Sequence, residues 1–154
     1  MINNDVLRSV RFMLKIDDAK LAAIITLGGG REVSAAELVT FLKREDEAGY
    51  VLCDNELMAH FLDGLIIHRR GRDESAPPRP VEKAVTNNTV LKKLRVAFEL
   101  REDDLISLMA AAGFEVSKPE LSALFRNAEH KNFRPCGDQF LRNFLKALAS
   151  RVRG

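Results

Sequence analysis

The feature that most constrains the fold is a stretch that occurs twice in the 154 residues. The segment Asn3-Asn4-Asp5-Val6-Leu7 returns as Asn87-Asn88-Thr89-Val90-Leu91, and the similarity continues to Gly71 in the first half and Gly154 in the second. A half of this length would bury only about 60% of its unfolded surface alone and would be marginally stable. The repeat therefore predicts one small unit made twice, with each copy covering the other.

Apolar residues recur at helical spacing almost throughout both halves. The first such stripe contains Val6, Leu7, Val10, Met13 and Leu14. Asn3 or Asn4 is a plausible N-cap for this helix, since asparagine is favoured there. We predict an all-α fold of two homologous four-helix units in tandem, packed with approximate two-fold pseudo-symmetry.

Three regions follow from the repeat. The first unit covers residues 1–71, and the second covers residues 87–154. Between them, residues 72–86 contain Ala76-Pro77-Pro78-Arg79-Pro80, and this density of proline forbids a continuous helix. We expect 72–86 to be an extended linker.

Composition excludes several classes of protein. No apolar run approaches the roughly 20 residues that a membrane-spanning helix needs, so we expect no membrane association. The first residues lack the pattern of a signal peptide, which predicts a cytoplasmic protein. Cys53 and Cys136 do not make a disulfide framework. No ligand set for a metal is complete, because structural zinc usually takes four ligands, and we predict neither a metal nor a cofactor.

The net charge of +2 is divided unevenly between the halves. Residues 1–71 carry 9 Lys/Arg and 11 Asp/Glu, a net charge of −2, whereas residues 87–154 carry 12 and 8, a net charge of +4. Such asymmetry indicates a surface for an acidic ligand on the second half, or two surfaces that attract each other.

Two sets of cations could form such a surface. Arg8 and Arg11 on the first helix match Lys92 and Arg95 on its copy, with Lys93 beside them. A second set follows the third helix of the second half, where Glu45-Asp46-Glu47 of the first half is replaced by Ala128-Glu129-His130. The candidate anion-binding residues are Arg8, Arg11, Lys92, Lys93, Arg95, His130, Lys131 and Arg134.

The leading functional hypothesis is a non-catalytic protein whose basic second half contacts the backbone of RNA or DNA. The alternative is a protein–protein adaptor or homo-oligomer that uses the acidic and basic loops. Solvated helix faces and drift in an exposed loop explain the same residues without any ligand.

A third hypothesis is an enzyme centred on Cys136, His130 and Asp138. Proximity in sequence shows nothing about orientation, and Cys53 matches Cys136 in the other copy without a matching histidine. Two buried packing residues explain the cysteines more simply. By the same reasoning His60 and Gly64 have packing or hydrogen-bonding roles, and Asp63 is a solvated helix-face carboxylate.

Several longer stretches resemble the YehS-like bacterial proteins, which contain two copies of a domain of unknown function. The resemblance rests on the two Asn-Asn-x-Val-Leu openings, the Lys-Arg-Glu-Asp-Glu-Ala-Gly-Tyr stretch at 43–50, the Phe-Leu-Asp-Gly-Leu-Ile stretch at 61–66, Arg70 to Ala76, and His130 to Leu141. It implies the duplicated helical fold over essentially the whole chain. It implies no activity, cofactor or catalytic residue, because none is established for the family.

Overall fold

The computed structural model describes residues 1–72, 75 and 84–154, and over this part of the chain all regular structure is helical. The first unit contains α1 (Asn3–Leu14), α2 (Asp18–Leu27), α3 (Ala35–Leu42) and α4 (Asn55–Arg70). The second contains α5 (Asn87–Ala97), α6 (Glu102–Ala111), α7 (Lys118–Leu124) and α8 (Asp138–Arg153). The predicted all-α fold of two tandem four-helix units is confirmed.

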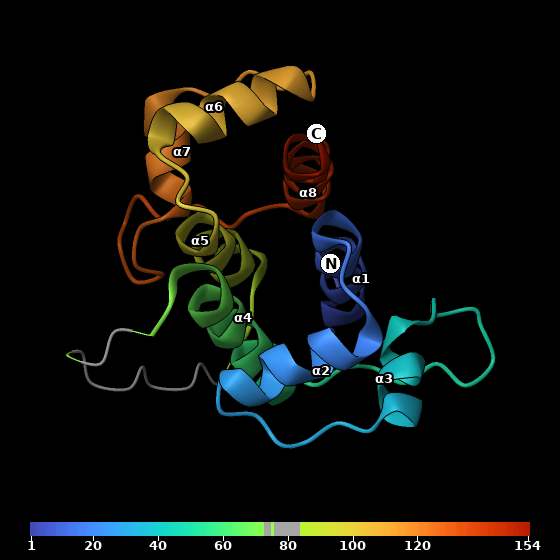
Figure 1. The fold of residues 1–154 in the computed structure, drawn as a ribbon. Helices are drawn as coiled ribbons and strands as arrows, with labels where there is room; N and C mark the ends of the chain where they lie inside the picture. The colour runs from blue at the N-terminus through green and yellow to red at the C-terminus, as the bar shows by residue number, and fades with distance from the viewer. Residues whose placement is uncertain (73–74, 76–83) are drawn as a thin grey trace.

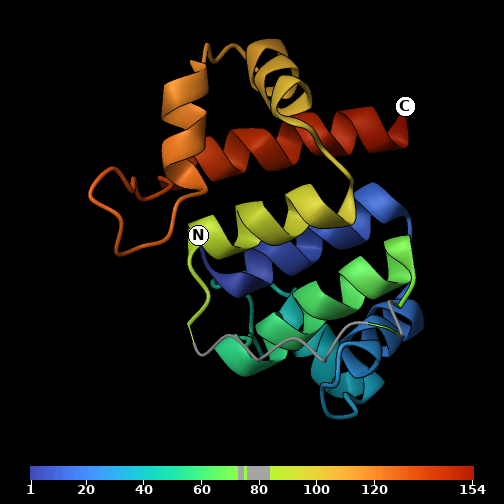
Figure 2. The same cartoon turned by 90° about the vertical axis from the view of Figure 1, so that its left-hand side faces the viewer.

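The first and last helices of both units form the centre of the molecule (Figure 1). There α1 packs against α8, and α4 packs against α5, so each unit gives one helix to each interface. These two interfaces are equivalent, because exchanging the units turns one into the other. Helices α2 and α3 cover one end of this central layer and α6 and α7 cover the other, as Figures 1 and 2 show. The arrangement has the expected approximate two-fold pseudo-symmetry.

The core consists of the apolar stripes that the sequence predicts. In α1, Val6, Leu7, Val10 and Met13 are buried, and the matching face of α5 is buried as well. The largest fully buried side chains include Phe61 and Phe144, which occupy equivalent places in α4 and α8. One continuous cluster spans both units, which explains how two marginal halves form one stable molecule.

Side chains cap the starts of α2, α3, α4 and α7, and Thr86 caps α5, whereas α1, α6 and α8 begin without a side-chain cap. Asp17, Ser34, Asp54 and Ser117 each accept a hydrogen bond from a backbone N–H of the first turn. At α1 the N-cap is Ile2, and no side chain caps the helix. The expectation that Asn3 or Asn4 caps α1 is therefore wrong.

The two asparagines at the start of α1 instead hold the segment that leads into α4. Asn4 donates to the carbonyl oxygens of Phe41 and Val51 at 3.0 and 2.8 Å and accepts from the N–H of Cys53 at 2.9 Å. Asn3 donates to the carbonyl oxygen of Cys53 at 2.9 Å. Buried backbone groups need such partners, so the pair acts as a clamp between distant segments.

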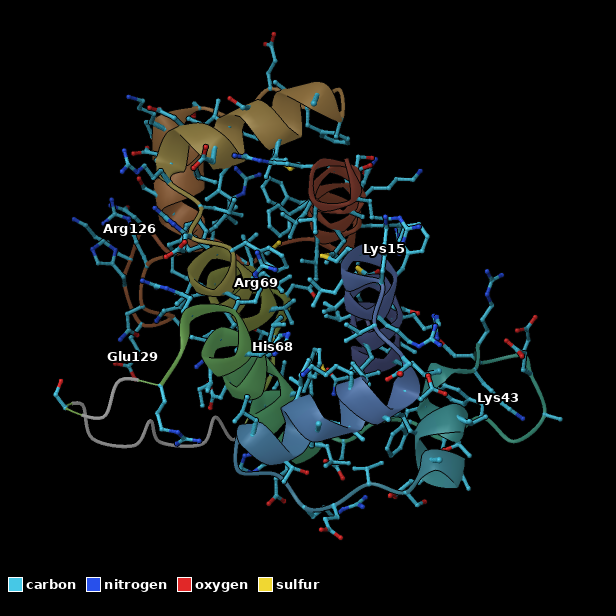
Figure 3. The ribbon with its side chains drawn as sticks, viewed as in Figure 1. Lys15, Lys43, His68, Arg69, Arg126 and Glu129 are labelled. Atoms are coloured by element: carbon cyan, nitrogen blue, oxygen red, sulfur yellow. The ribbon has the colours of Figure 1, made fainter. Side chains whose placement is uncertain are left out.

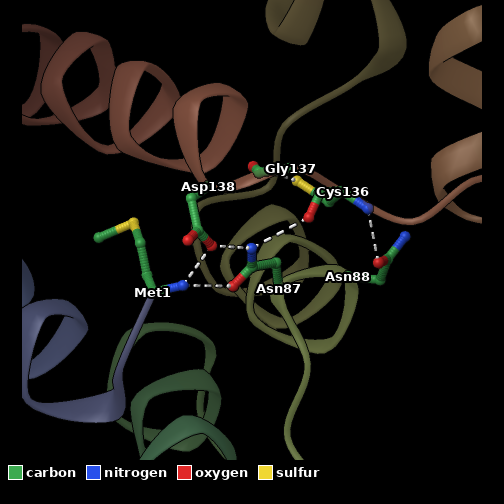
Figure 4. Close-up of polar contacts among 6 residues, drawn as sticks. All are labelled: Met1, Asn87, Asn88, Cys136, Gly137 and Asp138. Carbon is green, nitrogen blue, oxygen red and sulfur yellow. Dashed lines mark hydrogen bonds and ion pairs between the residues drawn. The ribbon is translucent and has the colours of Figure 1, made fainter.

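The second unit contains the same clamp, built from Asn87 and Asn88 (Figure 4). Asn88 bonds the carbonyls of Leu124 and Arg134, both at 2.9 Å, and accepts from the N–H of Cys136 at 2.8 Å. Asn87 donates to the carbonyl of Cys136 at 3.0 Å. The repeated Asn-Asn motif is thus explained by tertiary hydrogen bonding in both copies.

The crossing of α2 and α4 is unusually close. A Cβ atom added to Gly64 would lie 1.9 Å from the carbonyl oxygen of Ile24, and one added to Gly28 would lie 1.9 Å from that of His60. His60 completes the contact, since its Nδ1 lies 2.9 Å from the Gly28 oxygen. The packing roles predicted for Gly64 and His60 are confirmed. The equivalent positions in the second unit are Ala147 and Ala112, which exclude so close an approach.

Most of the expected linker, residues 73–74 and 76–83, lies outside the described residues. Among the helices that the structure does describe, none combines the length and apolar character needed to cross a membrane.

Candidate nucleic-acid interface

Two equivalent loops connect the third and fourth helices of each unit, at residues 43–54 and 126–137. In the first loop, Glu47 donates its N–H to the Arg44 carbonyl at 3.0 Å, and Val51 donates to the Thr40 carbonyl at 3.3 Å. In the second, His130 donates to Asn127 at 2.9 Å, and Arg134 donates to Ala123 at 3.1 Å. An asparagine pair holds each loop in the same way, so the two loops have equivalent backbone hydrogen bonds.

The side chains of the two loops carry opposite charge. The first loop has two Lys/Arg and four Asp/Glu, whereas the second has three Lys/Arg and one Asp/Glu. Figure 1 shows the loops on opposite sides of the molecule, one after α3 and the other after α7. They do not contact each other within one chain, so any attraction between them acts between chains.

The cations of the second loop are exposed. The side chains of Arg126, Lys131 and Arg134 are exposed to solvent, and so is that of His130 beside them. Figure 3 shows Arg126 and Glu129 at the edge of this loop. His130 accepts from the Asn132 N–H at 3.0 Å through Nδ1, and its Nε2 lies 3.4 Å from Arg126. Among described residues, Lys131 and Arg134 have no carboxylate within ion-pair distance, so both charges face solvent.

Helix α5 places two further cations beside this loop. Lys92 follows Asn88 by one helical turn, so it lies on the face that the clamp directs toward the loop, and its side chain is exposed. Arg95 lies one turn further. Its Nε donates to the Leu100 carbonyl at 3.2 Å, and its guanidinium stacks over Phe125 at 4.5 Å. Arg95 is therefore held by the Leu100 carbonyl and the Phe125 ring, while Lys92 is free to contact a ligand. We call Lys92, Arg126, His130, Lys131 and Arg134 the basic surface.

The matching arginines of α1 lie elsewhere. Arg8 donates to the Lys43 carbonyl at 2.8 Å and forms an ion pair with Asp5, while Arg11 pairs with Asp18 at 2.8 Å. Arg8 is therefore held against the acidic loop, Arg11 is held at the start of α2, and both charges are paired within the first unit. The structure does not gather the α1 and α5 cations into one surface.

Lys93 is largely removed from solvent. Its Nζ lies 2.8 Å from Asp63 Oδ1 of α4, and the two side chains are 10% and 11% exposed. Asp63 is thus a buried partner in the α4–α5 interface, and the expectation of a solvated carboxylate is wrong. A buried lysine bonded in this way is not available to a ligand.

The Cys136, His130 and Asp138 groups do not form a catalytic arrangement. The Cys136 thiol donates to the Gly137 carbonyl at 3.6 Å, and its burial raises its pKa to about 11. Burial raises the pKa of Cys53 to about 12. The Asp138 carboxylate accepts from the Met1 ammonium, which lowers its pKa (Figure 4). Both thiols are protonated at neutral pH, as expected of packing residues.

Sequence reasoning missed two features of this region. Arg126 belongs to the basic surface, but it directly follows α7, and the apolar periodicity does not place it in the loop. Asp63 was missed as an ion-pair partner, although its aspartate stands inside the apolar run Phe61 to Ile66, which is a signal for a paired buried charge. In the described part of the chain, no group of three or more His, Cys, Asp or Glu is placed to hold a metal ion.

The fold and the clamp define a class of duplicated helical proteins, and comparison with known proteins gives the family. A family model described as "Protein of unknown function (DUF1456)" matches residues 3–71 and again residues 87–154. The chain belongs to this family. A protein of Escherichia coli (strain K12) described as "Uncharacterized protein YehS" is 48% identical over 151 residues, which is 98% of this chain and 96% of that protein. No solved structure matches the chain.

Proposed function

We propose that this protein is a non-catalytic cytoplasmic binding protein whose basic surface contacts the phosphate backbone of RNA or DNA. The observation that carries the proposal is the pair of equivalent loops with opposite charge. The backbone bonds that build the loop are kept in both copies. The first loop, however, sets the exposed Arg44 among four carboxylates, whereas the second presents three exposed Lys/Arg side chains and a single carboxylate. Cations held on a fixed scaffold are suited to the regularly spaced charges of a phosphodiester backbone.

The chemistry of the basic surface favours backbone contact over base recognition. Most of the phenylalanines that could stack on bases are wholly or partly buried against the core, and Phe125 already carries the Arg95 guanidinium. Binding through phosphates alone is insensitive to sequence and strongly dependent on salt.

The test is a titration of fluorescein-labelled oligonucleotides of unrelated sequence over a series of salt concentrations. With roughly four cations contacting phosphates, the logarithm of the association constant should fall with the logarithm of salt with a slope of about −3. Similar affinities for the unrelated sequences are expected. Absence of binding at low salt, or binding that is insensitive to salt, contradicts the proposal.

A second candidate is supported by the other loop. Val51 and Leu52 are 48% and 56% exposed at the end of the acidic loop, and Val39 of the neighbouring helix is 44% exposed. An apolar patch beside Glu45, Asp46 and Glu47 would fit a basic protein surface, including the basic loop of another chain. Such a contact joins two different surfaces, so it produces head-to-tail rings or open chains.

Light scattering distinguishes this candidate. The self-association hypothesis expects a mass above that of one chain at low salt, lost in Glu45→Lys/Glu47→Lys. A mass equal to one chain at all protein and salt concentrations contradicts the self-association hypothesis. Nucleic-acid binding is then measured on the same monomeric sample.

A further inference from the structure

The two interfaces between the units differ in how they are filled. By the repeat, α5 and α4 form the counterpart of α1 and α8. Ser9 occupies the place in α1 that Lys93 occupies in α5, and Lys146 occupies the place in α8 that Asp63 occupies in α4. The buried Lys93–Asp63 ion pair at the α4–α5 interface is therefore replaced by a serine and a lysine at the α1–α8 interface.

This replacement coincides with an open groove. A groove of about 260 Å³ lies between α1 and α8, and both Ser9 and Lys146 line it. Its apolar lining includes Phe12, Leu145 and Ala149. Phe12 is 58% exposed, which is the largest exposed fraction of any large apolar side chain among the described residues. The small serine and the exposed lysine leave unfilled the space that the ion pair fills on the other side.

The groove has an excess of positive charge. Arg142 and Lys146 line it one turn apart on α8, and Arg153 stacks over the Phe12 ring at 4.0 Å while donating to the Phe12 carbonyl at 2.5 Å. None of the described residues that line the groove carries a carboxylate side chain. Lys146 makes no ion pair with any described residue, so the position of Asp63 has no anionic equivalent here.

We propose that the α1–α8 groove binds a small amphiphilic anion. Its carboxylate or phosphate group contacts Lys146 and Arg142 and supplies the negative charge that Asp63 supplies in the equivalent interface. Its apolar body packs on Phe12, Leu145 and Ala149. The volume is just below the roughly 300 Å³ at which small-molecule sites usually begin, so the ligand has about the size of one aromatic ring with a short chain. This site is separate from the basic surface and contains none of its residues.

The first experiment uses 3-phenylpropionate as the probe and 15N-labelled protein observed by NMR. Saturable shifts are expected at the amides of Ser9, Phe12 and Lys146. The neutral 3-phenylpropan-1-ol, which has the same apolar body, should bind at least about tenfold more weakly because it lacks the charge. Phenyl phosphate is tested in parallel, and the tighter of the two anions identifies the preferred head group.

Matched variants locate the site. Lys146→Glu should abolish probe binding, whereas Lys118→Glu, which changes an exposed lysine at the start of α7 outside the groove, should leave it unchanged. The double variant Ser9→Lys/Lys146→Asp copies the other interface. This variant should fold with a Tm equal to or above that of the wild type. It should no longer bind 3-phenylpropionate, because the new ion pair fills the groove.

Three results with the wild-type protein and the Lys146→Glu variant overturn the proposal. The first is the absence of saturable shifts up to about 10 mM probe, a concentration tenfold above the ~1 mM dissociation constant of a weak site. The second is equal binding of the acid and the alcohol. The third is unchanged binding of the probe in Lys146→Glu. A folded double variant that still binds the probe with wild-type affinity also contradicts it, because the site would then lie elsewhere.

Discussion

The loops 43–54 and 126–137 have the same backbone hydrogen bonds and opposite charge. The bonds from Asn4 to Val51 and from Asn88 to Arg134 are equivalent, but the side chains that they position are a valine and an arginine. Duplication has preserved what builds the unit and changed what the unit presents to solvent. The difference between the copies is therefore the best guide to function in a chain whose fold alone indicates none.

The interiors of the two units differ as well. In the first unit α2 and α4 meet through glycines, while alanines occupy the equivalent places in the second unit. The first unit also supplies the buried Asp63, whose counterpart Lys146 is exposed. The first copy is thus more closely packed at these positions, and the second is more open and more basic.

Replacing Gly64 with alanine is expected to give the largest effect. The added Cβ would meet the backbone of Ile24 at 1.9 Å, and backbone can relieve this only by moving the whole helix. We expect a loss of about 4 kcal/mol or more in the free energy of unfolding, measured by urea denaturation. Ala147→Gly is the matched control and should cost only about 1 kcal/mol, from helix propensity. Equal losses in the two variants would show that the crossings are equivalent.

Asp63→Ala should destabilise the protein by about 3 kcal/mol, because it leaves the Lys93 ammonium buried without a partner. The double replacement Asp63→Leu/Lys93→Met removes both charges and should restore most of the stability. Lys146→Ala in the equivalent place should change the free energy of unfolding by less than about 0.5 kcal/mol, since it is exposed. A large loss in Lys146→Ala would mean that the second interface is as closed as the first.

Replacing the clamp asparagine with alanine should destabilise the protein in both copies, and more strongly in the first. Asn4 is 0% exposed, whereas Asn88 is half-buried. Asn4→Ala leaves three backbone groups without their partner and should cost about 3 kcal/mol, and Asn88→Ala about half of this, because water reaches its partners. Thermal unfolding of the two variants measures the difference, and a larger loss in Asn88→Ala would reverse the assigned order.

The smallest expected effect concerns the two thiols. The pKa of Cys53 is about 12 and that of Cys136 about 11, both above the ordinary value of 9.0. Because burial favours the protonated thiols in the folded state, their contribution to stability is complete below pH 9 and is lost as the pH rises toward 11 and 12. At pH 8, Cys136 should react with a disulfide reagent about tenfold faster than Cys53, as its larger thiolate fraction requires. Single Cys→Ser variants show which rate belongs to which cysteine. A cysteine that reacts rapidly with the reagent at neutral pH would contradict the packing role assigned to it.

The sequence alone predicts most of the architecture, because the repeat, the apolar periodicity and caps such as Ser34 and Asp54 depend on local pattern. It does not predict the clamp, since an asparagine at a helix start satisfies the requirements of a cap and of a tertiary contact equally well. The burial of Lys93 also depends on which helix faces which, and that follows only from the packing of α4 on α5. The separation of Arg8 from Lys92 has the same origin, because equivalent helix faces of two symmetric units point to opposite sides.

The central claim is that the basic loop became a nucleic-acid surface while its copy did not. The most direct measurement is the salt dependence of oligonucleotide binding by Lys131→Ala/Arg134→Val, in which each cation is replaced by the residue found at the equivalent place, Ala48 or Val51. These substitutions keep the backbone bonds of the loop, so the fold should be unaffected. We expect weaker binding and a salt slope shallower by about 2. Unchanged affinity and slope in the folded variant would contradict the account.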